Sequence, residues 1–188
     1  QAEAILTDVA DACADEPLLS LGGTCVLQHL GGFRPRHRTE IRSGGGPIYG
    51  YDFVSGTGLD GMERTDPVLT TVVLECYRKP PAPAGATGCD AFGHVPEVVL
   101  PDDDANYALL HLGRRDCEPG GLLPLLPGAY LAGATSDVSV LITPIPLHPG
   151  DTVSFAVDYD ALVRAVTSPF VATGFIGGAP SAVAKGDS

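Results

Sequence analysis

The stretch that decides the fold is VLTTVVLECYR, residues Val68–Arg78. It is dense in β-branched residues, which favour extended backbone, and its apolar residues do not recur at helical spacing. Pro80, Pro81 and Pro83 follow it, and a proline cannot donate a hydrogen bond to a β-ladder. We therefore expect a long central strand, paired on both sides and followed by a loop over residues 80–93.

Shorter segments with strand or helix character lie on either side of this run. Helical spacing predicts a short amphipathic helix over Glu3–Asp15 and a second over Asp158–Val166, capped by Asp158 and ending before Pro169. Apolar or alternating runs bounded by turn residues predict further strands. These are Thr24–Leu30, Ile48–Val54, Val95–Leu100, Tyr107–Leu112, Val138–Thr143, Val153–Val157 and Phe170–Ile176.

The distribution of turn residues points to a fold class. The chain has 24 glycines and 17 prolines along 188 residues, which favours many short elements joined by tight turns. We predict a mostly β fold, either an antiparallel β-sandwich or jelly roll or a small barrel, with one or two short helices. The prediction is a single β-rich domain over residues 1–188, with an N-terminal helical segment over about residues 3–15. A C-terminal tail, residues 179–188, is expected to be flexible or held by a partner.

The composition excludes some functions. Hydrophobic residues make up 44% of the chain and charged residues 18%, which is typical of a globular protein and not of a disordered one. The formal net charge of -12 repels nucleic acid and anionic membranes over most of the surface. No run approaches the ~20 apolar residues of a membrane-spanning helix. We therefore expect a soluble protein that binds no membrane and, over most of its surface, no nucleic acid.

The cysteines and histidines show no pattern of a metal centre. Cys13, Cys25, Cys76, Cys89 and Cys117 are an odd number and contain no CxxC, so at least one is unpaired within the chain. Buried free thiols are the simplest interpretation, although a pair between Cys76 and Cys89 stays open. Cys89 and His94 could coordinate copper, but the only methionine, Met62, precedes them, whereas a blue-copper loop places it after them. We expect no metal.

Known catalytic and cofactor motifs are also missing. Residues Gly56–Gly61 satisfy GxGxxG, but Pro67 would end any following helix after about one turn, and a dinucleotide site needs that helix. No GxSxG motif and no P-loop lysine motif occurs. The triple acid Asp102–Asp104 lacks the glycine and spaced ligands of a calcium loop. We therefore predict no catalytic residue and no cofactor.

One basic cluster stands out in the acidic chain and gives the only sequence hint of a binding surface. It consists of Arg34, Arg36, Arg38 and Arg42, and guanidinium groups form paired hydrogen bonds with carboxylates. We predict that this cluster meets an acidic surface of another subunit, with Asp102, Asp103 and Asp104 as the opposing group. A phosphate or a nucleic-acid backbone is a further ligand that the cluster could bind, and a plain solvated loop is the alternative to any binding role.

In composition the chain resembles virion structural proteins, because it is strand-rich, rich in glycine and proline, and poor in lysine. The resulting functional prediction is a non-enzymatic protein that self-assembles into a symmetric homo-oligomer or joins other subunits of an assembly. Its location would be a virion capsid, tail or similar shell, or the extracellular space. The alternatives are a secreted β-sandwich module that binds a glycan or protein, and an enzyme on a jelly-roll or barrel scaffold.

Overall fold

The computed structural model describes residues 8–13, 16–32, 34, 36–81, 88–89, 93 and 100–174. The chain divides into two compact units, unit 1 over Gln1–Pro67 and unit 2 over Val68–Ser188. The sequence predicted one domain over residues 1–188. Two such units can belong to one domain or to two, so that expectation stays a prediction.

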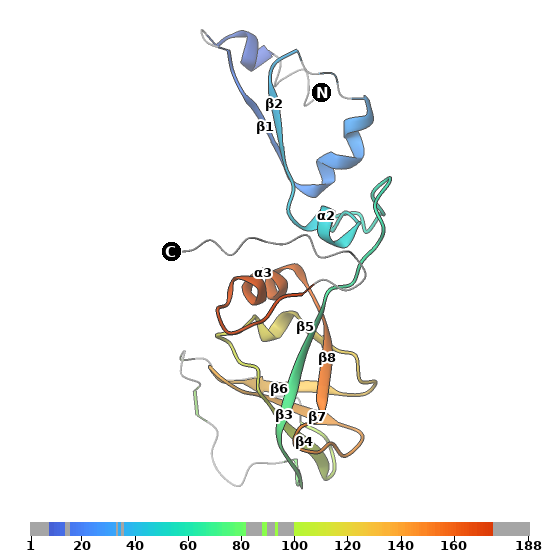
Figure 1. Cartoon of the computed structure of the whole chain (residues 1–188), viewed down its shortest axis with the longest axis vertical. Helices are drawn as coiled ribbons and strands as arrows, with labels where there is room; N and C mark the ends of the chain where they lie inside the picture. The colour runs from blue at the N-terminus through green and yellow to red at the C-terminus, as the bar shows by residue number, and fades with distance from the viewer. Residues whose placement is uncertain are drawn as a thin grey trace. The chain divides into compact units, whose positions relative to one another are not determined.

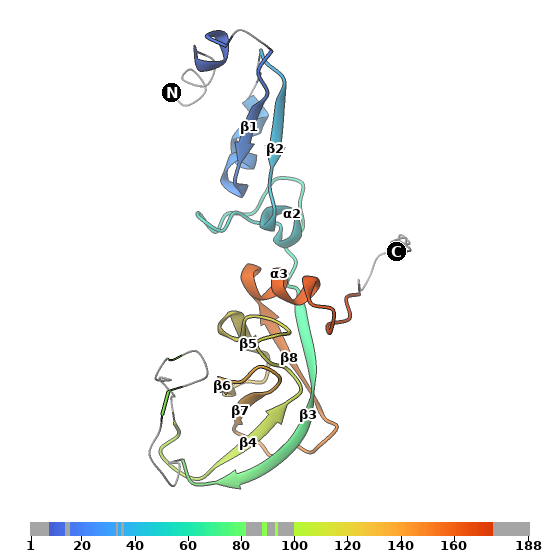
Figure 2. The ribbon, with the colours of Figure 1, turned by 90° about the vertical axis from the view of Figure 1, so that its left-hand side faces the viewer.

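Unit 2 is built on one six-stranded antiparallel sheet with the strand order β5, β8, β3, β4, β7, β6 (Figures 1 and 2). The edge strands β5 and β6 also approach each other, so the sheet curls into a nearly closed barrel. The strands are β3 (Val68–Lys79), β4 (Ala105–Leu110), β5 (Leu122–Pro124), β6 (Tyr130–Ala134), β7 (Ser139–Thr143) and β8 (Thr152–Val157). The predicted mostly β class is thus confirmed, but a single curled sheet differs from a sandwich or jelly roll, which consists of two packed sheets.

Strand β3 is the central element that its sequence predicts. Its first half pairs with β8, from Val68 opposite Ala156 to Val72 opposite Thr152. Its second half pairs with β4, from Val73 opposite Leu110 to Lys79 opposite Ala105, and this ladder contains a β-bulge between Val73 and Glu75. The curved course of β3 along the sheet is visible in Figure 2. The prediction of a long strand with a partner on each side is therefore confirmed.

Alternate residues of these strands form the core of unit 2. Phe155, Leu110 and Leu141 are completely buried, and every strand except the edge strand β6 contributes at least one buried residue to this core. Burying a side chain of this size contributes about 1.5–3 kcal/mol. Helix α3 (Tyr159–Thr167) follows β8 and adds the buried Ala161 and Ala165 to the same core. Asp158 caps its N-terminus, as predicted, and the short 3₁₀ helix η2 (Pro119–Gly121) precedes β5.

Unit 1 contains a parallel pair of strands that the sequence did not predict. Strand β1 (Leu19–Gly22) lies parallel to β2 (Thr39–Arg42), and the 3₁₀ helix η1 (Thr24–Gly32) connects them. Helix α2 (Gly45–Tyr49) follows β2 and ends at Gly50, whose φ of 71° is a left-handed conformation that favours glycine. None of the helices among the described residues has the length and apolar character needed to cross a bilayer.

Two strand predictions in unit 1 are wrong. Residues Thr24–Leu30 belong to η1, because the apolar residues at 26, 27 and 30 also match one face of a helix. Ile48–Val54 was predicted as a strand from alternating aromatic residues, but it begins inside α2. Its aromatic rings pack edge to face on one another, with centroids 5.1–6.0 Å apart, and do not alternate across a sheet.

The remaining predicted elements have mixed outcomes. Of the N-terminal segment, residues 8–11 are helical and Cys13 is not, while residues 1–7 and 14–15 lie outside the described residues. Residues 170–174 form no strand, which corrects part of the Phe170–Ile176 prediction; Pro169 directly precedes this segment. The predicted strand Val95–Leu100, apart from Leu100, and the tail at residues 179–188 lie outside the described residues.

Candidate functional site

The predicted basic cluster is partly neutralised within unit 1. Arg42 lies on β2 and not in a loop, and its Nε donates a hydrogen bond of 2.9 Å to Ser20 Oγ on β1. Arg36 lies 4.0 Å from the Asp11 carboxylate, and the neighbouring His37 contacts the same carboxylate at 2.7 Å. Arg34 and Arg38 are exposed. The proposed contact with another subunit stays a prediction.

The predicted opposing group, Asp102, Asp103 and Asp104, lies in unit 2. All three residues are exposed in the turn that precedes β4. Their position therefore leaves them accessible to a partner, and their contact with the basic cluster stays a prediction.

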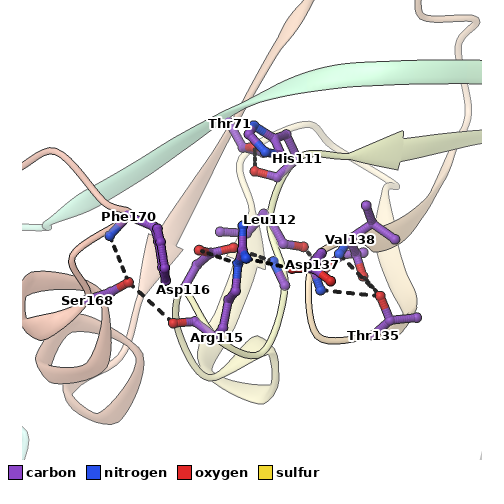
Figure 3. Close-up of polar contacts among 12 residues, drawn as sticks. Thr71, His111, Leu112, Arg115, Asp116, Thr135, Asp137, Val138, Ser168 and Phe170 are labelled. Carbon is purple, nitrogen blue, oxygen red and sulfur yellow. Dashed lines mark hydrogen bonds and ion pairs between the residues drawn. The ribbon is translucent and has the colours of Figure 1, made fainter.

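Unit 2 contains an open cleft of about 520 Å³ that the sequence did not predict. One wall is the first half of β3, residues 68–72. The opposite side comes from the turn His111–Asp116 after β4 and from residues 170–172 after α3. Three segments that are far apart in the sequence therefore meet at this cleft, and Figure 3 labels Thr71, Arg115 and Phe170 from them.

Arg115 is the residue on which the segments around the cleft converge (Figure 3). Its Nη1 lies 2.9 Å from Asp137 Oδ1 in the turn between β6 and β7, and its Nε lies 3.8 Å from Asp116 Oδ1. Its guanidinium also lies over the Phe170 ring, 4.4 Å from the centroid. The Arg115 side chain is 45% exposed. Because a guanidinium carries five N–H donors, it retains capacity for a ligand.

The turn that carries Arg115 is fixed by backbone contacts. Asp116 is buried, and its Oδ2 accepts a 2.8 Å hydrogen bond from the Gly113 N–H. Arg115 N–H donates to the Ser136 carbonyl at 3.1 Å. A Cβ on Gly113 would lie 2.2 Å from the Ser136 carbonyl oxygen, so only glycine permits this approach. The turn and the loop that bears Asp137 are thus held together before any ligand binds.

His111 and Ser168 connect the same turn to β3 and to the segment after α3. His111 N–H donates to the Val72 carbonyl at 2.9 Å, and Thr71 Oγ1 donates to the His111 carbonyl at 2.8 Å. The exposed His111 imidazole lines the cleft. Ser168 Oγ donates to the Arg115 carbonyl at 3.3 Å. The cleft therefore combines a guanidinium, an imidazole and two nearby carboxylates on a rigid frame.

None of these cleft residues was among the predicted site residues. The available signal was the charged triplet Arg114-Arg115-Asp116, which lies one residue after the predicted strand Tyr107–Leu112, because binding and catalytic residues often lie in loops. The partners of Arg115 lie in other segments at no fixed spacing, so no motif marks them. The site was missed because it is assembled by the tertiary fold.

The other sequence features give little evidence of a site. In the glycine loop, Gly56 and Gly61 have positive φ, and residues 62–67 form no helix. Among the described residues, no group of three or more His, Cys, Asp or Glu side chains could hold a metal ion. His94 lies outside the described residues, so the expectation that it and Cys89 bind no metal stays a prediction.

The chain is similar to two curated racemases. It is 31% identical to the lysine racemase of Thermotoga maritima over 157 residues, and the aligned region covers 82% of this chain and 44% of the racemase. It is 28% identical to the ornithine racemase of Acetoanaerobium sticklandii over 177 residues, and the aligned region covers 88% of this chain and 49% of that enzyme. The chain therefore spans about half the length of the curated relatives it matches.

Two further comparisons concern protein-family models and solved structures. No protein-family model matches the chain. The structure of an alanine racemase from Acinetobacter baumannii aligns with a TM-score of 0.40 and 13% identity, covering 72% of this chain and 38% of that one.

The racemase relatives overturn the functional prediction. The prediction of a non-enzymatic structural protein of a virion shell is wrong, because both curated relatives are enzymes that match over four fifths of this chain. The predicted location in a virion or outside the cell rested on the same interpretation and is contradicted with it. Of the alternatives, an enzyme on a barrel scaffold agrees with the relatives. The physical error was to treat the absence of a local motif as the absence of chemistry.

Proposed function

We propose that this chain is part of an amino-acid racemase that acts on a basic α-amino acid such as lysine or ornithine. The observation that carries the proposal is the similarity to two racemases named for these two amino acids. The chain spans about half of each relative. We therefore propose that it forms part of such an enzyme, and not that it carries the whole activity.

The cleft in unit 2 offers groups suited to an amino acid. A guanidinium binds carboxylates through paired hydrogen bonds, so Arg115 is our candidate for the α-carboxylate. Its stacking on Phe170 and its contact with Asp137 would hold the guanidinium in one orientation. Asp137 is 58% exposed and is our candidate for an ammonium group of the substrate.

Racemisation also requires proton transfer at the α-carbon. A proton leaves one face and another is returned to the opposite face, so groups that can act as base and acid must lie near the carbon. Within the described cleft, the exposed His111 imidazole is our candidate for this role, because an imidazole can both accept and donate a proton. The proton-transfer role of His111 and the substrate contacts of Arg115 and Asp137 are proposals.

Two predictions about self-association are part of this proposal. A homo-oligomer fits an enzyme as well as it fits a shell protein, so self-association is retained. We also propose that Arg34, Arg36, Arg38 and Arg42 of one copy contact residues 102–104 of another. Its signature would be weaker association at high salt, because exposed ion pairs contribute only about 0–1 kcal/mol and are screened.

The proposed function is tested by proton exchange and by ligand titration. The purified chain is incubated in D₂O with L-lysine or L-ornithine, alone and together with the part of the Thermotoga maritima lysine racemase that it does not match. Loss of the α-proton signal and appearance of the D-enantiomer are measured by NMR and chiral chromatography. We expect exchange with both basic amino acids in the combined sample. Amide signals of Gly113, Arg115 and Asp137 should shift when the chain alone is titrated with L-lysine.

A matched pair of variants makes the titration specific. Arg115→Gln removes the guanidinium of the cleft, whereas Arg78→Gln removes an exposed guanidinium on β3 outside the cleft. We expect the first to weaken lysine binding by about tenfold or more, as for the loss of a charged hydrogen bond, and the second to leave it unchanged. Absence of both exchange and lysine-induced shifts in a folded sample would refute the proposal.

A further inference from the structure

The first half of β3 has a sheet partner on one side only. Strand β8 pairs with residues 68–72 on one side, whereas the pairing with β4 on the other side begins at Val73. The strand therefore has a free edge over residues 68–72, and the same residues line the cleft. Backbone N–H and C=O groups at such an edge are strong hydrogen-bonding groups that another molecule can use.

Hydrogen bonds on both sides of the strand show which backbone groups point to the cleft. The Ser154 carbonyl accepts from the Leu125 N–H at 2.8 Å and so points to β5, which makes Thr70 and Ser154 an opposite pair without mutual backbone bonds. The Val72 carbonyl points away from β8 and accepts from the His111 N–H at 2.9 Å. Because backbone groups two residues apart in a strand point to the same side, the N–H and C=O of Thr70 point to the cleft.

The backbone of Thr70 is open on this side. Among the residues that the structure describes, none makes a backbone hydrogen bond to its N–H or C=O from the cleft. The Thr70 hydroxyl is engaged elsewhere, with Ser154 Oγ at 2.9 Å. Thr71 Oγ1 donates to the His111 carbonyl at 2.8 Å and closes one end of the edge. The free edge therefore presents one donor and one acceptor, both on Thr70, in a strand that β8 holds in place.

An α-amino acid matches this donor and acceptor. In a hydrogen-bonded pair of an antiparallel sheet, two opposite residues exchange both of their backbone bonds. A free amino acid opposite Thr70 can form the same pair, because its α-ammonium donates to the Thr70 carbonyl and its α-carboxylate accepts from the Thr70 N–H. Both bonds involve a charged group, which makes them stronger than the neutral bonds of a sheet. The second carboxylate oxygen is left for Arg115, which lines the same cleft.

We propose that the free edge of β3 binds the substrate as a one-residue strand opposite Thr70. This inference rests on the proposed function, and it adds a position for the α-ammonium of the substrate. Asp137, which is 58% exposed, is then left for the ammonium at the end of the substrate's side chain.

The same pairing places the side chain of an L-amino acid. Opposite residues of an antiparallel pair direct their side chains to the same face of the sheet, so the substrate's side chain lies on the face of Thr70. Val68 and Val72 lie on that face too, because alternate residues of a strand share a face, and they are 54% and 43% exposed. The methylene stem of lysine can pack against them. The edge therefore favours amino acids with a long aliphatic stem.

A series of ligands that each lack one group tests the inference by NMR of the full chain. L-Lysine should shift the amide and carbonyl signals of Thr70, whereas the Thr71 amide, which faces β8, should move little. L-Norleucine lacks only the distal ammonium and should give the same Thr70 shifts, with an affinity lower by about fivefold at most. ε-Aminocaproate lacks the α-ammonium and cadaverine lacks the carboxylate. Each should bind about tenfold more weakly than lysine, or weaker still.

A pair of variants tests the edge itself. Thr70→Pro removes the N–H that faces the cleft but no bond to β8, and proline is tolerated at a free strand edge. We expect it to weaken lysine binding by about tenfold or more. Ser154→Ala removes the hydroxyl contact that the proline variant also loses, keeps the Thr70 backbone and should bind lysine like the wild type. Circular dichroism checks the fold of both. If the proline variant does not fold, the ligand series decides.

The outcomes distinguish this inference from the proposed function. If lysine shifts the amides of Gly113, Arg115 and Asp137 but not that of Thr70, the edge does not bind the substrate, and the proposed function stands. Equal affinities for lysine, ε-aminocaproate and cadaverine overturn the inference in the same way. If lysine shifts no signal of the cleft and no proton exchange occurs, the inference and the proposed function are both wrong.

Discussion

Replacing Asp158 with alanine should loosen the helix that leads to the cleft. Asp158 Oδ1 accepts a 2.8 Å hydrogen bond from the Ala161 N–H at the start of α3. The Asp158 N–H donates to the Gly121 carbonyl at 2.9 Å and so ties the cap to the segment before β5. The alanine variant keeps this backbone contact and loses only the side-chain cap and its negative charge.

The magnitude follows from these two losses. Removing an N-cap side chain costs about 1 kcal/mol, with a range of about 0.5–2, and removing a negative charge beside a helix N-terminus costs about 0.3–1 kcal/mol. We expect the free energy of unfolding to fall by about 1–2 kcal/mol. For a unit of this size the melting temperature would then fall by about 3–8 °C. Urea unfolding of the full chain, followed by circular dichroism, measures the change.

Two control variants define what would refute this reasoning. Asp158→Asn keeps a side-chain oxygen that can cap the helix and should lose less than half as much stability. Asp160→Ala removes an exposed carboxylate that pairs with Arg164 Nε at 3.3 Å, and such pairs contribute about 0.3–0.5 kcal/mol. If Asp158→Ala matches the wild type, or if Asp158→Asn is equally unstable, the cap does not stabilise α3.

Three further changes probe the core and the turn. Phe155→Ala should lower the free energy of unfolding by about 3–5 kcal/mol in urea titrations, because Phe155 is completely buried. Ser139→Ala should cost about 1–3 kcal/mol by the same measurement, because the buried Ser139 Oγ donates to the Leu112 carbonyl at 2.6 Å, which would lose its partner. Burial raises the pKa of the Cys117 thiol from 9.0 to about 11. The thiol therefore ionises at a lower pH in the unfolded chain than in the folded one. The stability gained by burying the neutral thiol is fully present below about pH 9 and is lost as the pH rises through about 11. Urea midpoints between about pH 8 and 11 should fall less steeply for Cys117→Ala.

Much of unit 2 was predictable from the sequence because its elements have a single physical interpretation. Val68–Arg78 is too rich in β-branched residues for a helix, and the segments that became β4, β7 and β8 lie between clear turn residues. Asp158 followed by apolar residues at helical spacing predicts a capped helix, which is α3. Strand β5 was missed because it has three residues and ends in Pro124, which is acceptable only at a sheet edge.

Unit 1 was less predictable because its apolar runs are short and fit two periods. Val26, Leu27 and Leu30 satisfy a strand and a helix equally, and the surrounding glycines do not decide between them. Tertiary contacts decide instead. Thr24 Oγ1, for example, accepts a hydrogen bond from Gly46 N–H at 3.1 Å and so joins η1 to α2. A local window of sequence contains no information about such a contact.

The missed cleft shows why the absence of a motif did not exclude an enzyme. A motif records residues that one local element holds in place, whereas Arg115 is held by Asp137 from one loop and Phe170 from another. The relatives are about twice the length of the matched region, so a shared active site need not place all of its residues in this half. The same net charge that argues against nucleic acid favours cationic small molecules, because a negative surface raises their local concentration. The acidic composition therefore agrees with the basic amino acids of the proposed function.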